Sequence, residues 1–379
     1  YFEASDGTYG SELWKYNGTN PPSMVADIRP GFDSSFPSYL TVFNNELYFL
    51  GSNGVNGSEL WKYNGTNPPS MVADIRPGSG SSSPRHLTVF NNELYFQASD
   101  GTYGAEFWKY DGVNAPSMVA DMFFGSGGSY PDDLTVFNNE LYFQAYSIIY
   151  GYELWKYDGT TASMLVDKVV GGGSSSPHSF VIFSSSQLGT GLFFLADYNN
   201  SAYQGDRISA YFPECLSCGN DYVRINESEA PEVSNSDLIV YKDKLYFYGW
   251  ASDADFNTEL YSLTIDMEVE SYTGINPDGE SGVASYPPRF VEFNNQLYFQ
   301  ANLGDGFALC AYDGSNIPYY VVNPESANPN LIIYTRPFIH DGMMYFRSSD
   351  GVHGQELWKY DGYTFSMVAD MNPDSLISF

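Results

Sequence analysis

The sequence is poor in basic residues and contains no long apolar run. Its 379 residues include 16 Lys and Arg against 46 Asp and Glu, which gives a formal net charge of −30. Such a surface repels phosphate backbones, so we do not expect nucleic acid as a partner. A membrane-spanning helix needs about 18 or more consecutive apolar residues, and no such run occurs. The composition is that of an acidic protein without a membrane span.

Cysteine and histidine are also scarce, with three and four residues respectively. Cys215 and Cys218 lie in an insertion, and their spacing fits a small loop disulfide, a redox pair or half of a zinc site. A zinc site normally needs four ligands, and no second cysteine pair or nearby histidine exists. A thioredoxin-like redox role needs a βαβ context, so we favour a structural disulfide. The histidines show no spacing that indicates a metal site or a charge-relay pair: His86, His178, His340 and His353.

What the chain does have is an internal repeat. An aromatic pair ending in Phe returns eight times, at Tyr1-Phe2, Tyr48-Phe49, Tyr95-Phe96, Tyr142-Phe143, Phe193-Phe194, Tyr246-Phe247, Tyr298-Phe299 and Tyr345-Phe346. The first residues of successive pairs are 47, 47, 47, 51, 53, 52 and 47 residues apart. A period of about 40 to 50 residues is typical of propeller blades and other arrays.

Each repeat contains four short segments with the pattern of β-strands. The stretch LTVFNNELYF, at 40–49, 87–96 and 134–143, indicates a hairpin, because Asn tolerates the positive φ of a tight turn. Residues 106–110 are aromatic and alternating, as in a half-buried strand. After an Asp-Gly turn, residues 117–121 supply the fourth strand.

These segments predict an all-β fold, and their regular repetition favours an eight-bladed β-propeller of four-stranded antiparallel blades. We expect a single domain over residues 1–379, with an insertion in the fifth repeat around 213–220. Residues 373–379 resemble the first-strand segment 131–137, whereas Tyr1 begins inside a second strand. We therefore expect the C-terminal strand to join the N-terminal blade and close the ring.

The third-strand segment carries a distinctive signature. Residues 153–160 read ELWKYDGT, residues 26–31 read ADIRPG, and the stretch 12–31 recurs unchanged as 59–78. This pattern resembles the ELW-x-x-DGT (hyalin-like) repeats of secreted β-propeller proteins, many of them bacterial or marine. The resemblance covers nearly the whole chain, and it implies an extracellular propeller. It ties no residue to catalysis.

Acidic residues recur at two positions of the repeat. A carboxylate repeated in most blades is more often structural than functional, accepting hydrogen bonds from a neighbouring loop. Six glutamates open the third strand: Glu12, Glu59, Glu106, Glu153, Glu259 and Glu356. Calcium takes six to eight oxygens, so the loops before this strand are calcium candidates in competition with simple Asp-Gly turns. The aspartates of these loops are Asp6, Asp100 and Asp350, with Asp253 in a divergent copy.

Two further residue types have predicted roles. Asn-x-Ser/Thr sequons in predicted loops could carry a glycan in a glycosylating compartment; they are Asn17, Asn56, Asn64, Asn199 and Asn226. At Asn17 and Asn64 the Asn-Gly pair is also good turn chemistry. One tryptophan per repeat is expected to be buried between blades, at positions 14, 61, 108, 155 and 358. Cys310 occupies the same position in the seventh repeat, as a small core residue.

The sequence favours a non-enzymatic function. It contains no phosphate loop, nucleophile elbow or convergent catalytic set. The first hypothesis is an extracellular structural or adhesive module with protein or glycan partners in a surface or matrix assembly. The alternatives are a calcium-assisted glycan-binding module and, less favoured, a polysaccharide-active enzyme. We expect no cofactor apart from calcium.

Recognition is expected where the repeat is least regular. The fifth to seventh repeats are the longest, and loops on a rigid scaffold commonly carry binding residues. The specific contact is therefore predicted at the loop from Pro213 to Asn220 and at Trp250.

Overall fold

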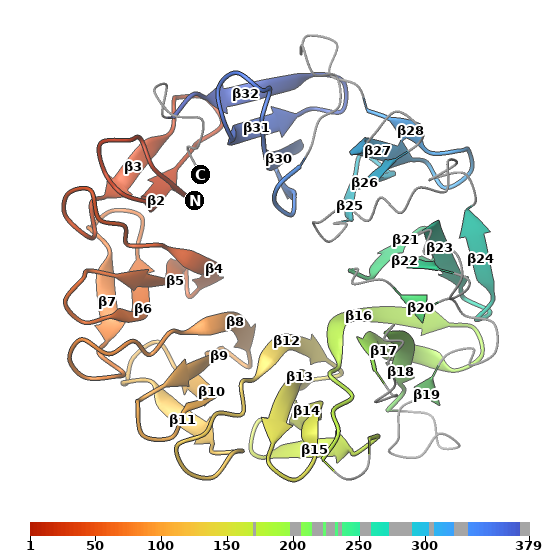
Figure 1. Ribbon diagram of the computed structural model, residues 1–379, viewed down its shortest axis with the longest axis horizontal. Helices are drawn as coiled ribbons and strands as arrows, with labels where there is room; N and C mark the ends of the chain where they lie inside the picture. The colour runs from red at the N-terminus through yellow and green to blue at the C-terminus, as the bar shows by residue number, and fades with distance from the viewer. Residues whose placement is uncertain are drawn as a thin grey trace. The chain divides into compact units, whose positions relative to one another are not determined.

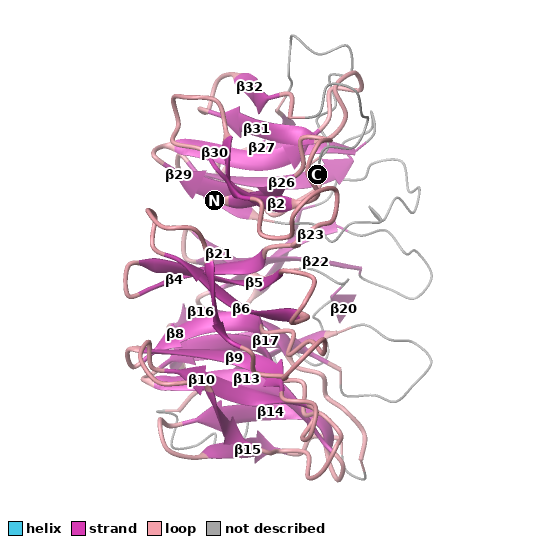
Figure 2. Ribbon diagram, turned by 90° about the vertical axis from the view of Figure 1, so that its left-hand side faces the viewer, coloured by secondary structure: helices cyan, strands magenta, loops and turns pink. Residues whose placement is uncertain are grey.

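The computed structural model describes residues 1–169, 172–197, 206–213, 223–224, 232–233, 237–250, 259–272, 290–302, 307–321 and 333–371. Within these ranges the regular structure is entirely β-strand, as Figure 2 shows, and none of it is helical. The described chain forms two compact units: residues 1–178 together with Met371, and residues 179–370. No helix that could span a membrane is found among the described residues.

Unit 1 contains four antiparallel sheets, each built from consecutive strands (Figure 1). The first has three described strands, β1 (Phe2–Ala4), β2 (Glu12–Lys15) and β3 (Ser23–Ala26). The second has β4 (Ser38–Phe43), β5 (Glu46–Ser52), β6 (Ser58–Tyr63) and β7 (Ser70–Ala73). The third has β8 (Arg85–Phe90), β9 (Glu93–Ser99), β10 (Ala105–Tyr110) and β11 (Ser117–Ala120). The fourth has β12 (Asp132–Phe137), β13 (Glu140–Ser147), β14 (Gly151–Tyr157) and β15 (Ala162–Val166).

Unit 2 contains four more antiparallel sheets, and the sixth has an additional short strand. The fifth sheet has β16 (His178–Ser185), β17 (Gly189–Ala196), β18 (Arg207–Tyr211) and β19 (Val223–Arg224). The sixth has β20 (Glu232–Val233), β21 (Ile239–Tyr241), β22 (Lys244–Trp250), β23 (Glu259–Thr264) and β24 (Val269–Tyr272). Its additional strand is β20, which pairs with β22. The seventh has β25 (Val291–Phe293), β26 (Gln296–Asn302), β27 (Phe307–Tyr312) and β28 (Tyr319–Tyr320). The eighth has β29 (Phe338–His340), β30 (Met343–Ser348), β31 (Glu356–Tyr360) and β32 (Phe365–Ala369).

These sheets are the blades of an eight-bladed β-propeller with four-stranded antiparallel blades, which confirms the predicted fold class. We number the blades one to eight in chain order. The predicted pairing of the C-terminal strand with the N-terminal blade falls on residues 372–379, which lie outside the described residues. That closure stays a prediction.

The hairpin turns and the core agree with the sequence pattern. Asn91 and Asn92 adopt φ of 47° and 60° in the turn between β8 and β9, as predicted for an Asn-Asn pair. Phe96 is fully buried, and Trp108 opposite it is 8% exposed. Cys310 is buried at the same position of blade seven, as expected of a small core residue.

Candidate functional site

A buried glutamate at the start of the third strand holds the connector to the next blade. In blade three, Glu106 accepts hydrogen bonds from the Ser129 hydroxyl at 2.5 Å, the Ser129 backbone N–H at 2.9 Å and the Met122 N–H at 3.1 Å. The equivalent pairs are Glu12–Ser35, Glu59–Ser82 and Glu153–Ser175. This confirms the predicted structural role for these four glutamates, and for Glu259 and Glu356 it stays a prediction.

Burial changes the ionisation of these glutamates. Removal from water raises the pKa of Glu106 to about 7, although its three hydrogen bonds act in the opposite direction. The pKa of Glu153 is raised to about 7 for the same reason. We call each glutamate with its serine a glutamate–serine clasp. The clasp fixes the residue just before the first strand of the next blade.

Each clasp serine is followed by two residues with a left-handed backbone conformation, one position and four positions after it. In the connector from blade three to blade four these are Tyr130 and Asp133, with φ of 48° and 53°. The second lies in a β-bulge, because the register between β12 and β13 shifts between Asp132 and Thr135. Non-glycine residues in this region cost about 1 to 3 kcal/mol each, and bulges re-aim side chains, so both features mark candidate functional positions.

The side chains at these strand starts differ from blade to blade, although the neighbouring sequence hardly changes. LTVFNNELYF is identical in blades two to four. The three residues around the proline that precedes it vary: Phe36, Ser38 and Tyr39; Ser83, Arg85 and His86; Tyr130, Asp132 and Asp133. A near-identical scaffold therefore presents a different set of side chains in each blade.

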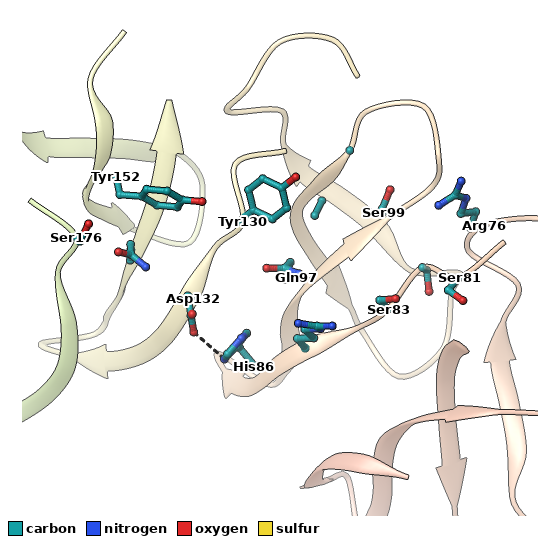
Figure 3. Close-up of a pocket in the computed structure, with 15 residues that line it drawn as sticks. Arg76, Ser81, Ser83, His86, Gln97, Ser99, Tyr130, Asp132, Tyr152 and Ser176 are labelled. Carbon is teal, nitrogen blue, oxygen red and sulfur yellow. Dashed lines mark ion pairs between the residues drawn. The ribbon is translucent and has the colours of Figure 1, made fainter. Parts of the chain in front are cut away.

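Five of these variable residues line a cavity of about 640 Å³ across blades three and four (Figure 3): Ser83, Arg85, His86, Tyr130 and Asp132. Arg76 and Ser83 come from the connector before blade three, and Tyr130 from the connector before blade four. Gln97 and Gln144 lie on the second strands β9 and β13. We call this cavity the strand-start pocket. The sequence prediction missed it, because only comparison of the blades in space brings these positions together.

His86 and Asp132 form an ion pair inside the strand-start pocket. The His86 Nδ1 lies 2.9 Å from Asp132 Oδ1, although the two residues are 46 positions apart in the chain. Burial alone would raise the pKa of Asp132, but the contact with His86 and the Asp133 N–H outweigh it and lower that pKa. The histidine spacing in the sequence did not indicate this contact, and a histidine–aspartate pair alone is not a charge-relay set. Within the described residues no serine hydroxyl is hydrogen-bonded to the His86 ring.

Arg76 differs from its counterpart Arg29 in blade one, because Arg29 is paired with an acidic side chain. There, Arg29 pairs with Asp33 at 3.1 Å. The residue equivalent to Asp33 is Gly80, since the exact repeat ends at Gly78. Within the described residues neither Arg76 nor Arg85 has an ionic partner. In a protein with a net charge of −30, two such arginines make a localised basic region.

The strand-start pocket is therefore bipolar, with a guanidinium group at one end and a carboxylate toward the other. Figure 3 shows Arg76 beside serines at one end, and Tyr130, Tyr152 and Asp132 toward the other. Gln97 and Gln144 add side-chain amides, which offer both a donor and an acceptor. Such an arrangement can bind a polar ligand with charges of both signs.

The predicted calcium ligands act as turn caps. Asp6 Oδ1 accepts hydrogen bonds from the N–H groups of Thr8 and Tyr9, each at 2.9 Å. Asp100 and Asp350 cap their loops in the same way. Among the described residues, no three acidic, histidine or cysteine side chains gather as a metal site would require. Asp253 lies outside the described residues.

The predicted glycosylation sites have different surroundings. Asn17 and Asn64 are exposed, and their side-chain oxygens cap their own turns. Asn56 is half-buried, and its amide nitrogen donates to Asp74 at 2.9 Å, so it is a poorer acceptor for a glycan. Asn199 and Asn226 lie outside the described residues.

The predicted contact and disulfide residues lie mainly beyond what the structure describes. Cys215, Cys218 and Asn220 fall in the range 214–222, outside the described residues. Pro213 is half-buried just after β18, and Trp250 ends β22. These assignments stay predictions.

No protein-family model and no curated protein matches the sequence, so the resemblance to hyalin-like repeats stays a prediction. Solved structures do match. A puromycin-hydrolysing peptidase of Mycobacterium tuberculosis is 11% identical, with a TM-score of 0.55 over 92% of this chain and 55% of its own. A prolyl endopeptidase is 10% identical, with a TM-score of 0.52 over 90% of this chain and 51% of its own. The β-propeller domain of the Trilobed protease from Pyrococcus furiosus is 11% identical, with a TM-score of 0.47 over 90% of this chain and 99% of its own.

These matches correct the functional hypothesis drawn from the sequence. The structures that the chain resembles are peptidases, which contradicts the prediction of a non-enzymatic secreted module with a structural or adhesive role, together with its glycan-directed alternatives. That prediction assumed that near-identical blades carry no distinctive site, whereas the strand starts of blades three and four differ. Identities of 10% and 11% establish the shared fold, and the chain spans about half the length of the first two proteins.

Proposed function

We propose that this protein is of the peptidase class and that the propeller binds the peptide in the strand-start pocket. The observation that carries the proposal is the bipolar pocket of about 640 Å³, built from residues that differ between otherwise repeated blades. The likeness in fold to two peptidases supports the same class. We assign only peptide binding to this pocket, and we name no group that cleaves the peptide bond.

A short peptide matches the chemistry of this pocket. Its carboxylate suits the guanidinium groups of Arg76 and Arg85, since Arg binds carboxylates through two parallel N–H bonds. Its backbone alternates donors and acceptors, which the amides of Gln97 and Gln144 can pair. An ammonium group or polar side chain can lie toward the end that contains Asp132.

Blade one provides the variant that tests the carboxylate contact. Gly80→Asp recreates the Arg29–Asp33 pair beside Arg76 and retains the arginine. A Cβ at position 80 would lie 2.6 Å from Arg76 Nε, 2.8 Å from its Cδ and 2.9 Å from its Cγ, so this flexible side chain has to shift to accommodate the aspartate. Asn20→Asp adds the same charge in an exposed turn of blade one and serves as the control.

The measurement is calorimetric binding of tetra-alanine with a free or an amidated C-terminus. Amidation of the peptide and the Gly80→Asp substitution should each weaken binding by tenfold or more. The amidated peptide should bind Gly80→Asp almost as well as it binds the native chain. Hydrolysis of the same peptides is followed by mass spectrometry, and we expect Gly80→Asp to raise KM at unchanged kcat. A protein that neither binds nor cleaves peptides, or equal losses in Gly80→Asp and Asn20→Asp, would refute the proposal.

A further inference from the structure

Blade seven lacks an ion pair that the regular blades share. In blades two, three and four a glutamate that begins the second strand pairs with a lysine of the third strand at 2.9 to 3.0 Å: Glu46–Lys62, Glu93–Lys109 and Glu140–Lys156. Blade seven has Gln296 and Ala311 at these two positions. Both charges are absent there, and Ala311 is fully buried.

A tyrosine lies opposite this alanine on the neighbouring strand. Tyr319 pairs with Ala311 across β27 and β28, where the regular blades have a serine opposite the lysine. Gln296 Nε2 donates to the Tyr319 hydroxyl at 3.0 Å, and this hydroxyl also lies 3.2 Å from Gln296 Oε1. The ring is 49% exposed, so the substitution creates a held but accessible aromatic surface.

Four more tyrosines complete a cavity of about 510 Å³ between blades seven and eight. The full set is Tyr298, Tyr319, Tyr320, Tyr360 and Tyr363. Tyr298 and Tyr360 contact edge to face at a centroid distance of 5.9 Å, which fixes the floor of the cavity. Tyr363 is 88% exposed in a turn where blade one has Thr19. We call this cavity the tyrosine pocket.

Among the residues that the structure describes, those that line the tyrosine pocket are uncharged, in contrast to the strongly acidic chain around it. Its polar groups are phenol hydroxyls and the amides of Asn294 and Gln296. A ligand that fits must therefore present flat or compact apolar groups together with neutral hydrogen-bond acceptors. The described lining offers no ionic contact, so it suits an uncharged ligand better than a phosphopeptide or a nucleotide.

We propose that the tyrosine pocket binds a proline-containing peptide segment in the polyproline II conformation. Such a segment has no internal hydrogen bonds, so its carbonyls are free to accept from the Tyr363 hydroxyl and from the second amide N–H of Asn294 or Gln296. The hydroxyls of Tyr298, Tyr319 and Tyr360 already donate within the protein, so these rings provide apolar faces. Proline has no N–H that would need an acceptor, and aromatic-lined grooves recognise this conformation because it is already ordered. The site is separate from the strand-start pocket and does not depend on the function proposed for it.

The test uses the peptide acetyl-hexaproline-amide, which has no charge and cannot use the contact with Arg76. Binding is measured by calorimetry. Tyr319→Ser should weaken it at least tenfold, because the ring provides the apolar face on which the prolines pack. Tyr319→Phe should weaken it less, since the ring remains.

A reversion variant guards against simple misfolding. Gln296→Glu combined with Ala311→Lys and Tyr319→Ser restores the residues that blades two to four already contain, so the blade is expected to fold while the pocket is lost. Gly80→Asp, in the other unit, should leave hexaproline binding unchanged. The proposal is overturned if hexaproline does not bind, if the reversion variant binds it as well as the native chain, or if maltohexaose binds at this site and hexaproline does not.

Discussion

Replacing Glu106 by glutamine should make the free energy of unfolding less dependent on pH. The carboxyl group is buried, and its pKa is raised from 4.5 to about 7. A carboxyl whose pKa is higher in the folded state stabilises the fold when it is protonated. Its contribution is complete below pH 4.5 and is lost as the pH rises through about 7. Glutamine is neutral throughout and nearly the same size, so this dependence disappears.

The size of the effect follows from the two pKa values. At about 1.4 kcal/mol per pH unit, the interval from 4.5 to about 7 corresponds to roughly 3 kcal/mol for Glu106. The free energy of unfolding of the native chain should thus fall by about that amount, relative to Glu106→Gln, between pH 4.5 and pH 8. Urea unfolding of both chains at each pH measures the difference, in which the titration of all other groups cancels.

Glu93 in the same blade is the matched control. Burial would raise its pKa, but hydrogen bonds from Tyr95 and Lys109 lower it instead. Its stabilising contribution is therefore present above the unfolded pKa and is lost only as the pH falls below 4.5. The free energy of unfolding of Glu93→Gln should differ from that of the native chain by a constant amount between pH 5 and pH 8. If Glu106→Gln behaves in the same way, the clasp carboxyl titrates normally and the reasoning is wrong.

Three further predictions concern the scaffold. Trp108→Ala should lower the free energy of unfolding by about 3 to 5 kcal/mol through lost burial and a cavity; a loss below about 1 kcal/mol in urea unfolding would show that the ring is not core. Asn92→Ala should cost about 1 to 2 kcal/mol, because φ is 60° there, while Asn92→Gly should be close to neutral in the same assay. Removing residues 213–220 should leave the circular dichroism spectrum and the urea midpoint unchanged; a large shift in either would mean that the insertion belongs to the core.

The scaffold was predictable because it repeats. Eight aromatic pairs at steps near 47 residues indicated the number of blades. The alternation of apolar and polar residues along the strands indicated which side chains face the core. The Asn-Asn turns and the role of glutamates such as Glu106 also followed from the residue types. Each of these features depends on contacts that are short in sequence or identical in every blade.

The strand-start pocket was not predictable, because its partners come from different blades. His86 and its ion-pair partner Asp132 lie at the strand starts of neighbouring blades, 46 positions apart in the chain. Nothing in the local sequence around His86 indicates that contact. The signal that could have found it is the variation itself: three residues that change in each copy beside ten that do not.

A crystal structure with tetra-alanine bound tests the central claim most directly. The account predicts the peptide in the strand-start pocket of blades three and four, with its carboxylate within hydrogen-bond distance of Arg76 or Arg85. Peptide density elsewhere on the protein, with this pocket containing only water, would contradict it.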